Sequence, residues 1–173
     1  GQGGAFITKC VAQLMRDFGS SPSAFNAFLL NLGMETLHVR MPKHCANAQA
    51  VAEFLQAHDK VAWVQYCGLP GDKYYERGKK YLPNGSCGVL SFGVKGGRAA
   101  AETFMKHLKL AAIVTHVADA RTCILHPASS THRQMSDEEL LACGVAPDLM
   151  RLSVGIEDAE DIIADIRNAL ESI

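Results

Sequence analysis

The hydrophobic positions in the first third of the chain recur with the period of an α-helix. Residues 5–18 form a first helical stretch that should end at Gly19. The sequence Ser-Ser-Pro-Ser at 20–23 then supplies an N-cap and a proline for the first turn of a second helix. In this second helix, apolar residues at i, i+3, i+4 and i+7 predict one buried face. That face comprises Phe25, Phe28, Leu29 and Leu32.

A third helix is expected from about residue 34 to about residue 58. Its pattern places Leu37 and Met41 on the inward side. Pro42 interrupts the pattern, and a proline inside a helix removes one backbone hydrogen bond and crowds the preceding turn, at a cost of about 3 kcal/mol. The sequence therefore predicts a kink or a restart of the helix at Pro42.

Beyond Asp59 the pattern changes to the short, β-branched and alternating runs that are typical of strands. Strands are expected at residues 61–66, 88–94, 110–117, 121–125 and 149–154. Helices are expected at residues 72–81, 98–108 and 137–143, and from Asp158 onward. Ser136 and Glu139 have the spacing of a capping box at the start of one of these helices.

This order of elements predicts an α/β (α+β) fold, in which amino-terminal helices precede a small, mostly antiparallel sheet of about four to five strands with helices packed on it. The change of pattern also predicts a division of the chain. Residues 1–58 form a helical segment, and residues 59–173 form a small carboxy-terminal α/β domain.

Composition and charge remove several classes of function. The 173 residues carry 17 Lys and Arg against 18 Asp and Glu, with no basic stripe, which disfavours nucleic acid as a partner. No apolar run approaches the ~20 residues that span a bilayer, and no positively charged segment precedes a short apolar stretch, so we expect neither a transmembrane nor a secreted protein and no membrane partner. The chain has the balance of a cytoplasmic protein that acts on small molecules.

The six cysteines are widely spaced and include no Cys-x-x-Cys pair. This spacing predicts buried or half-buried thiols in a reducing compartment. His44 with Cys45, and Cys123 with His126, are the only pairs at ligand-like spacing. Two donors make a poor metal site, so no metal is expected.

In the last predicted strand, alternation places Met150, Leu152 and Val154 toward the core and Arg151 and Ser153 on the other side. Two interpretations of Arg151 remain open. It is either a solvated side chain on a polar strand face, or an anion-binding group whose planar guanidinium grips a carboxylate through two hydrogen bonds.

Residues 126–132 combine two imidazoles with several hydroxyls after a predicted strand. The pattern suits a turn whose hydroxyls bond to local backbone, and a functional cluster is the alternative. The chain has no Gly-x-Ser-x-Gly elbow for a hydrolase nucleophile, and its glycine pairs lack the spacing of a phosphate-binding loop. From the residues alone, the outcome is an α/β domain with a candidate carboxylate-binding arginine.

Five ordered motifs extend this picture. They are METLHVRM at 34–41, HCANA at 44–48, GVKGG at 93–97, LHPASSTH at 125–132 and RLSVGIED at 151–158. In this order the motifs resemble the carboxy-terminal part of the Cys/Met-metabolism family of pyridoxal-phosphate enzymes, and the likeness covers essentially the whole chain. Within the family, Glu35, residues 80–83 and residues 132–134 resemble the sulfhydrylases that act on O-acetylhomoserine.

The resemblance implies specific roles for two residues. Arg151 is implied to bind the α-carboxylate of the substrate. His116 stands where the family has a Ser or Asn that makes a second contact with that carboxylate. The resemblance places the Schiff-base lysine and the phosphate-binding residues upstream of this chain, and Lys9 is not their equivalent. No catalytic, cofactor-binding or metal-binding residue is therefore expected in the chain, and by itself it should neither bind pyridoxal 5'-phosphate nor turn over.

The implied fold is that of type I pyridoxal-phosphate enzymes, with residues 1–58 leading from a large cofactor domain. The implied reaction is γ-replacement, in which sulfide or methanethiol displaces acetate from O-acetyl-L-homoserine to give homocysteine or methionine, a step of methionine biosynthesis in a homotetramer. Methionine γ-lyase and cystathionine γ-synthase or lyase are alternatives within the family. Outside it, the alternative is a non-catalytic, stand-alone module that serves assembly or binds an amino-acid carboxylate.

Overall fold

The computed structural model describes residues 4–173 in two compact units. The first unit extends to His38 and the second runs from Val39 to Ile173. The predicted division of the chain at residues 58 and 59 does not coincide with the boundary between these units, because the second half of the long helix packs with the sheet. Residues 1–3, which belong to the predicted helical segment, lie outside the described part of the chain.

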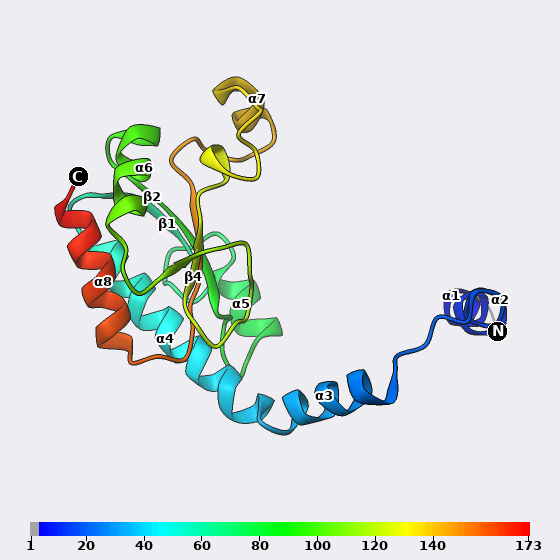
Figure 1. The fold of residues 1–173 in the computed structure, drawn as a ribbon. Helices are drawn as coiled ribbons and strands as arrows, with labels where there is room; N and C mark the ends of the chain where they lie inside the picture. The colour runs from blue at the N-terminus through cyan, green and yellow to red at the C-terminus, as the bar shows by residue number, and fades with distance from the viewer. Residues whose placement is uncertain (1–3) are drawn as a thin grey trace. The chain divides into compact units, whose positions relative to one another are not determined.

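The first unit is helical, as predicted. Its elements are α1 (Ala5–Lys9), the π-helical stretch η2 (Cys10–Met15), α2 (Arg16–Phe18) and α3 (Ala24–Glu35), shown in blue in Figure 1. The first helical run ends at Gly19, whose φ of 68° is left-handed. The predicted cap of α3 is confirmed, because the side chain of Ser23 accepts a hydrogen bond from the backbone N–H of Asn26 at 3.2 Å.

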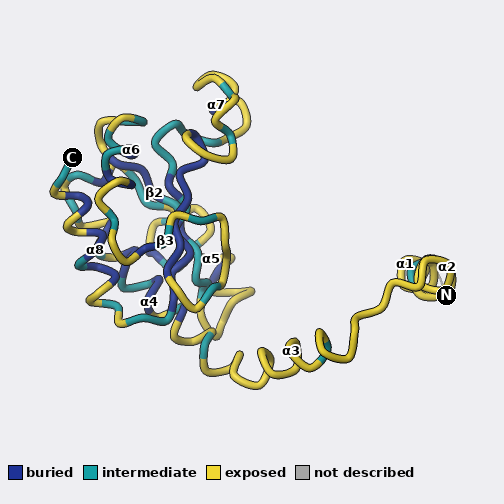
Figure 2. The backbone as a smooth tube through the Cα atoms, viewed as in Figure 1, coloured by how far each residue is buried: buried dark blue, intermediate teal, exposed yellow. Residues whose placement is uncertain are grey.

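The predicted buried face of α3 is wrong. Phe25 is 67% exposed and Phe28 is 58% exposed, and Leu29 and Leu32 are exposed too. Figure 2 shows α3 almost entirely in the colour of exposed residues. Helical periodicity identifies which side of a helix is apolar. It does not say whether other residues of this chain pack against that side.

The predictions for the third helix are also corrected. The helix α4 (Leu37–Ala57) begins directly after Thr36 and runs through Pro42 without a restart. Leu37 and Met41, which were expected to face inward, are exposed. Pro42 is the sixth residue of the helix, so it removes one bond of the ladder and crowds the turn before it. The turns that follow Pro42 are buried, and their packing maintains the helix.

The second unit is built on a five-stranded sheet. Its strands are β1 (Val61–Gln65), β2 (Val89–Val94), β3 (Ala112–Ile113), β4 (Cys123–Leu125) and β5 (Met150–Ser153), in the order β1-β2-β5-β4-β3. All neighbouring pairs are antiparallel except β3 and β4, which are parallel. The predicted α/β class with a mostly antiparallel sheet is therefore confirmed.

The predicted strand at 110–117 is mostly wrong. Only Ala112 and Ile113 form β3, and the residues that follow leave the sheet as a loop. In this loop Ala118 has a φ of 59°, and it is the only non-glycine residue with a positive φ in the described chain. The left-handed conformation cannot continue a strand, so the loop turns back toward β4.

The remaining helices are close to their predicted positions. They are α5 (Tyr75–Tyr81), α6 (Gly97–His107), α7 (Asp137–Ala142) and α8 (Ala159–Glu171), and the 3-10 turn η3 (Pro127–Ser129) lies within the stretch interpreted as a turn. The capping box of α7 is confirmed, with Ser136 and Glu139 each bonding to the other's backbone. No helix in the described part of the chain combines the length and apolarity needed to cross a membrane.

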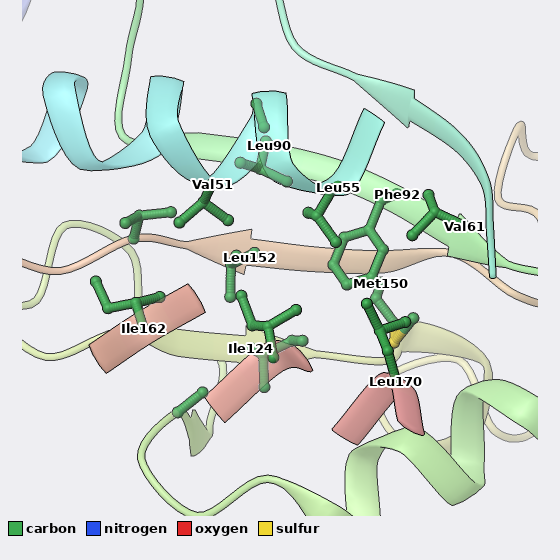
Figure 3. Packing of buried hydrophobic residues seen from close by; sticks show 14 of the residues in the cluster. Val51, Leu55, Val61, Leu90, Phe92, Ile124, Met150, Leu152, Ile162 and Leu170 are labelled. Carbon is green, nitrogen blue, oxygen red and sulfur yellow. The ribbon is translucent and has the colours of Figure 1, made fainter. Parts of the chain in front are cut away.

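One face of the sheet carries the hydrophobic core. Helices α4, α6 and α8 pack on this face, and Figure 3 shows side chains of α4 and α8 meeting those of the strands. In β5 the side chains of Met150, Leu152 and Val154 are fully buried in this cluster, as the alternation predicts. Arg151 and Ser153 therefore belong to the opposite face of the sheet.

Candidate functional site around Arg151

Arg151 lies on the central strand of the sheet, on the face opposite the helices. Residues directly opposite each other on neighbouring strands share a face. Arg151 pairs with Ser91 of β2 and with Leu125 of β4, whereas Ser153 pairs with Cys123. This second face therefore brings a guanidinium, two hydroxyls and a thiol onto adjacent strands.

The guanidinium of Arg151 is neither freely solvated nor fully bonded. Its Nη2 donates to the backbone carbonyl of Thr115 at 2.9 Å. Its Nε is buried and has no hydrogen-bond partner. An arginine side chain has five N–H donors, and a buried donor without an acceptor is costly. The side chain is thus oriented by one backbone contact and retains an unsatisfied donor for another acceptor.

The loop that follows β3 is attached to β5 at two points. Thr115 accepts from Arg151, and the backbone N–H of Ala118 donates to Oγ of Ser153 at 3.0 Å. The two contacts enclose His116, the other predicted site residue. The structure therefore brings the two predicted residues into one region, because Arg151 bonds to the residue that precedes His116 in the chain.

His116 faces a carboxylate of the same loop. Its Nδ1 lies 3.4 Å from Oδ2 of Asp119, and its side chain is 57% exposed. Asp119 also accepts from the backbone N–H of Arg121 at 3.0 Å. That N–H and the Arg121 guanidinium lower the pKa of Asp119 below its usual value, so the carboxylate is ionised at neutral pH.

A largely apolar cavity of about 190 Å³ adjoins the loop. Residues of α4, β2, β5 and the loop line it, among them His44, Val117 and Ser153. Sequence reasoning did not place α4 at this site. The pattern could have indicated it, since His44 and Asn47 are polar residues within an otherwise apolar buried stretch of the helix.

His44 and Asn47 attach α4 to the chain that follows β5. Nδ1 of His44 lies 2.6 Å from the carbonyl oxygen of Val154, so Nδ1 carries the proton, and Nε2 is buried without a partner. The side-chain amide of Asn47 donates to the carbonyls of Gly155 at 3.0 Å and Glu157 at 2.7 Å. These contacts fix the end of the strand that carries Arg151.

The predicted thiols are mostly buried or half-buried, but Cys143 is exposed, which contradicts the general expectation. Burial raises the pKa of Cys45 and Cys67, and it raises that of Cys123 with a further contribution from Asp119. Cys143 follows a short helix, α7, that has a single buried residue. An apolar neighbourhood in the sequence therefore does not ensure a buried position.

The imidazole of His126 has a structural role. It contacts Oγ of Ser129 at 2.8 Å and the carbonyl of Pro147 at 2.8 Å, and the hydroxyl of Ser130 donates to the His126 carbonyl at 2.6 Å. The interpretation of residues 126–132 as a turn held by local hydroxyls is supported. The sequence pair Cys123 and His126 makes no joint site, because both ring nitrogens of His126 contact other groups, and Nδ1 of His44 contacts the Val154 carbonyl and not Cys45.

A Schiff base to pyridoxal phosphate needs a lysine amine. The cavity beside the loop is lined by no lysine of the described chain. Lys9 bonds to Gln13 within its own helix, and Lys60 donates to carbonyls at the end of α8. The unsatisfied Nε–H of Arg151 is a donor that can bind an anion such as a carboxylate.

Comparisons with known proteins decide the family. The family model "Cys/Met metabolism PLP-dependent enzyme" matches residues 3–171. The chain belongs to this family. Homocysteine synthase of Schizosaccharomyces pombe is 46% identical over 96% of the chain and 39% of that protein. The L-methionine gamma-lyase of Treponema denticola is 47% identical over 90% of the chain and 38% of that protein.

A solved structure from Campylobacter jejuni confirms the fold of this Cys/Met-metabolism chain. That protein is assigned as an O-acetylhomoserine (thiol)-lyase, and its structure contains N'-pyridoxyl-lysine-5'-monophosphate. The match has a TM-score of 0.88 and 38% identity, and it covers 97% of this chain and 40% of the other. The chain therefore spans about two-fifths of the length of the proteins it matches. The resemblance inferred from the five motifs is confirmed.

Proposed function

We propose that this chain is the substrate-binding, carboxy-terminal part of an enzyme that replaces the acetyl group of O-acetyl-L-homoserine with sulfide or methanethiol. The products would be homocysteine or methionine, together with acetate. The orientation of Arg151 carries the proposal, since its guanidinium retains an unsatisfied donor on the face of the sheet opposite the helices. The names of the homocysteine synthase and the O-acetylhomoserine (thiol)-lyase support the choice of substrate.

In this proposal Arg151 holds the α-carboxylate of the substrate through charge-assisted hydrogen bonds, which contribute about 1.5–3 kcal/mol each. His116 makes a second contact with the same carboxylate. Nδ1 of His116 lies 3.4 Å from Oδ2 of Asp119, which orients the ring and leaves Nε2 as the atom for such a contact. Both residues bind and orient the substrate, and neither transfers a proton to it.

The cofactor lies outside the chain in this proposal. Pyridoxal phosphate, which serves the family as an electron sink, would be held by an upstream large domain that also supplies the lysine. Residues 1–58 would lead from that domain, and residues 59–173 would form the small domain. We further propose that the complete enzyme is a cytoplasmic homotetramer of the methionine biosynthetic route.

Substitution of Arg151 in the full-length enzyme tests carboxylate binding. Arg151→Lys retains the charge but loses the planar fork, and Arg151→Gln loses both. We expect KM for O-acetylhomoserine to rise at least about tenfold in the first variant and further in the second, with the cofactor absorbance intact. The exposed Arg133 provides a matched control, since Arg133→Gln should leave KM unchanged. An unchanged KM in Arg151→Gln would remove Arg151 from the site.

A second candidate is a γ-lyase that eliminates rather than replaces, and the 47% identity to the Treponema enzyme favours it. The two reactions give different products from the same substrate. Full-length enzyme supplied with O-acetylhomoserine and sulfide should form homocysteine faster than 2-oxobutyrate if replacement is its reaction. Faster formation of 2-oxobutyrate under these conditions would favour the lyase.

A further inference from the structure

Three different metal-ligating side chains meet beside β4. They are the imidazole of His116, the carboxylate of Asp119 and the thiol of Cys123, and one ligand atom of each lies within 4.8 Å of the others. His116 is exposed, Asp119 is half-buried and Cys123 is buried. The group therefore has a rigid end inside the sheet and an open end that solvent can reach.

The segment that carries these residues is held in place by its neighbours. Two backbone hydrogen bonds fix its far end, from Ala112 N–H to the Thr122 carbonyl and from Ile156 N–H to the Ala120 carbonyl, each at 2.9 Å. The contacts of Thr115 with Arg151 and of Ala118 with Ser153 fix its near end. Little conformational freedom remains to be lost when a ligand binds.

The two oxygens of the Asp119 carboxylate have different partners, and these partners orient the side chain. Oδ1 accepts from the backbone N–H of Arg121 at 3.0 Å and lies 3.5 Å from the Arg121 guanidinium. Oδ2 faces Nδ1 of His116 at 3.4 Å. A metal-binding carboxylate is commonly positioned in this way, with a hydrogen bond to the oxygen that does not face the metal.

We propose that His116, Asp119 and Cys123 form a binding site for Zn²⁺. Imidazole nitrogen, carboxylate oxygen and thiolate sulfur are the usual donors to zinc, and a set of three leaves one position open in a tetrahedral site. As the bond between the metal and Sγ of Cys123 forms, the thiol releases its proton to solvent. The site then balances the two charges of the cation with one carboxylate and one thiolate.

Positive charge near the site sets its strength. The guanidinium of Arg121 contacts Asp119, and Arg151 bonds to the same loop. Both repel a cation, so the site should be weaker than a structural zinc site with four protein ligands. The inference does not rest on the proposed function. If His116 does contact the substrate carboxylate, bound zinc would occupy the same imidazole and weaken substrate binding.

Titration of the chain with Co²⁺ tests the site directly, because this ion takes the place of zinc and reports its ligands by absorption. A charge-transfer band from thiolate to Co²⁺ should appear and saturate at about one equivalent, and Zn²⁺ should abolish it. Cys123→Ser should remove the band. His116→Ala and Asp119→Asn should weaken binding at least about tenfold.

The controls use donors of the same kinds outside the group. Cys143→Ser removes an exposed thiol and His132→Ala removes another imidazole, and both variants should bind Co²⁺ like the parent chain. Persistence of the band in Cys123→Ser, or its absence from the parent chain, would overturn the proposal. If circular dichroism shows that Cys123→Ser does not fold, the test rests on His116→Ala, because His116 is exposed and its substitution should not disturb the fold. Unchanged binding in His116→Ala would then overturn it.

Discussion

Nη2 of Arg151 donates a hydrogen bond to the backbone carbonyl of Thr115 at 2.9 Å, and the two residues are 36 positions apart in the chain. This bond connects the central strand of the sheet to the loop that carries His116. Because its acceptor is a backbone carbonyl, the contact cannot be removed by substitution of Thr115. The loop can instead be tested at its second attachment, where Ser153 accepts from Ala118.

Replacement of Ser153 by alanine should loosen this loop. The variant leaves the Ala118 N–H without its acceptor in a partly buried position, so the free energy of unfolding should fall by about 1 kcal/mol. Amide hydrogen exchange over residues 114–119 should accelerate more than exchange in α8. Ser153→Thr keeps the hydroxyl and is the conservative comparison. Equal protection of the loop in Ser153→Ala and the parent chain would contradict the assignment.

Gly155 should not tolerate even an alanine. A Cβ at this position would lie 2.5 Å from the Ala120 carbonyl oxygen and 2.5 Å from the Thr122 nitrogen, and it would also contact the Glu157 carboxylate. Two of these groups are backbone and cannot move aside, so Gly155→Ala should cost about 1–3 kcal/mol in urea unfolding.

Gly33 is the matched control for this substitution. It lies within α3, where a Cβ would meet nothing within 4 Å. Gly33→Ala should therefore be neutral or slightly stabilising, because alanine has the higher helix propensity. Equal destabilisation by both alanines would show that the crowding at Gly155 is not the cause.

Tyr66 should make the stability of the chain sensitive to high pH. Burial raises the pKa of its hydroxyl, the Cys87 thiol adds to the rise, and the hydroxyl donates to the Cys87 carbonyl at 2.8 Å. The folded state therefore favours the protonated form. Its contribution to stability is complete below about pH 10, the pKa of an unfolded tyrosine, and is lost as the pH rises from there toward the folded pKa.

Tyr66→Phe isolates this contribution. At neutral pH the variant should be less stable by about 1 kcal/mol, for the lost hydrogen bond. The difference from the parent chain should shrink as the pH of urea unfolding is raised above about 10. Tyr81 is 69% exposed, and Tyr81→Phe should show neither effect. A difference that stays constant with pH would contradict the role given to the Tyr66 hydroxyl.

Local patterns predicted the parts of the fold that depend on local properties. The alternation of β5 correctly separated Leu152 from Arg151, because successive side chains of a strand point to opposite faces of the sheet. The capping box at Ser136 and Glu139 was also readable, since both partners lie within one turn. The prediction of a buried face on α3 was wrong for the opposite reason. Burial of an apolar helix face depends on residues outside the helix, which a local pattern does not contain.

The site depends on contacts between distant residues and was only partly predictable. His44 reaches the Val154 carbonyl across 110 residues, and the loop after β3 is shaped by its bonds to Arg151 and Ser153. No local pattern indicates such pairings. Alternation alone also left the role of Arg151 open, and only the ordered family motifs favoured carboxylate binding over a solvated side chain.

The strand order has a consequence for synthesis of the chain. The strand β5 is the last of the five to be made, yet it occupies the centre of the sheet between β2 and β4. Until Met150–Ser153 has left the ribosome, the β1–β2 pair and the β3–β4 pair cannot join, and each presents an open edge to other chains. A ribosome that stalls shortly before residue 150 would thus release one chain in which the β1–β2 pair and the β3–β4 pair are not joined. We expect such products to require chaperones or proteolysis.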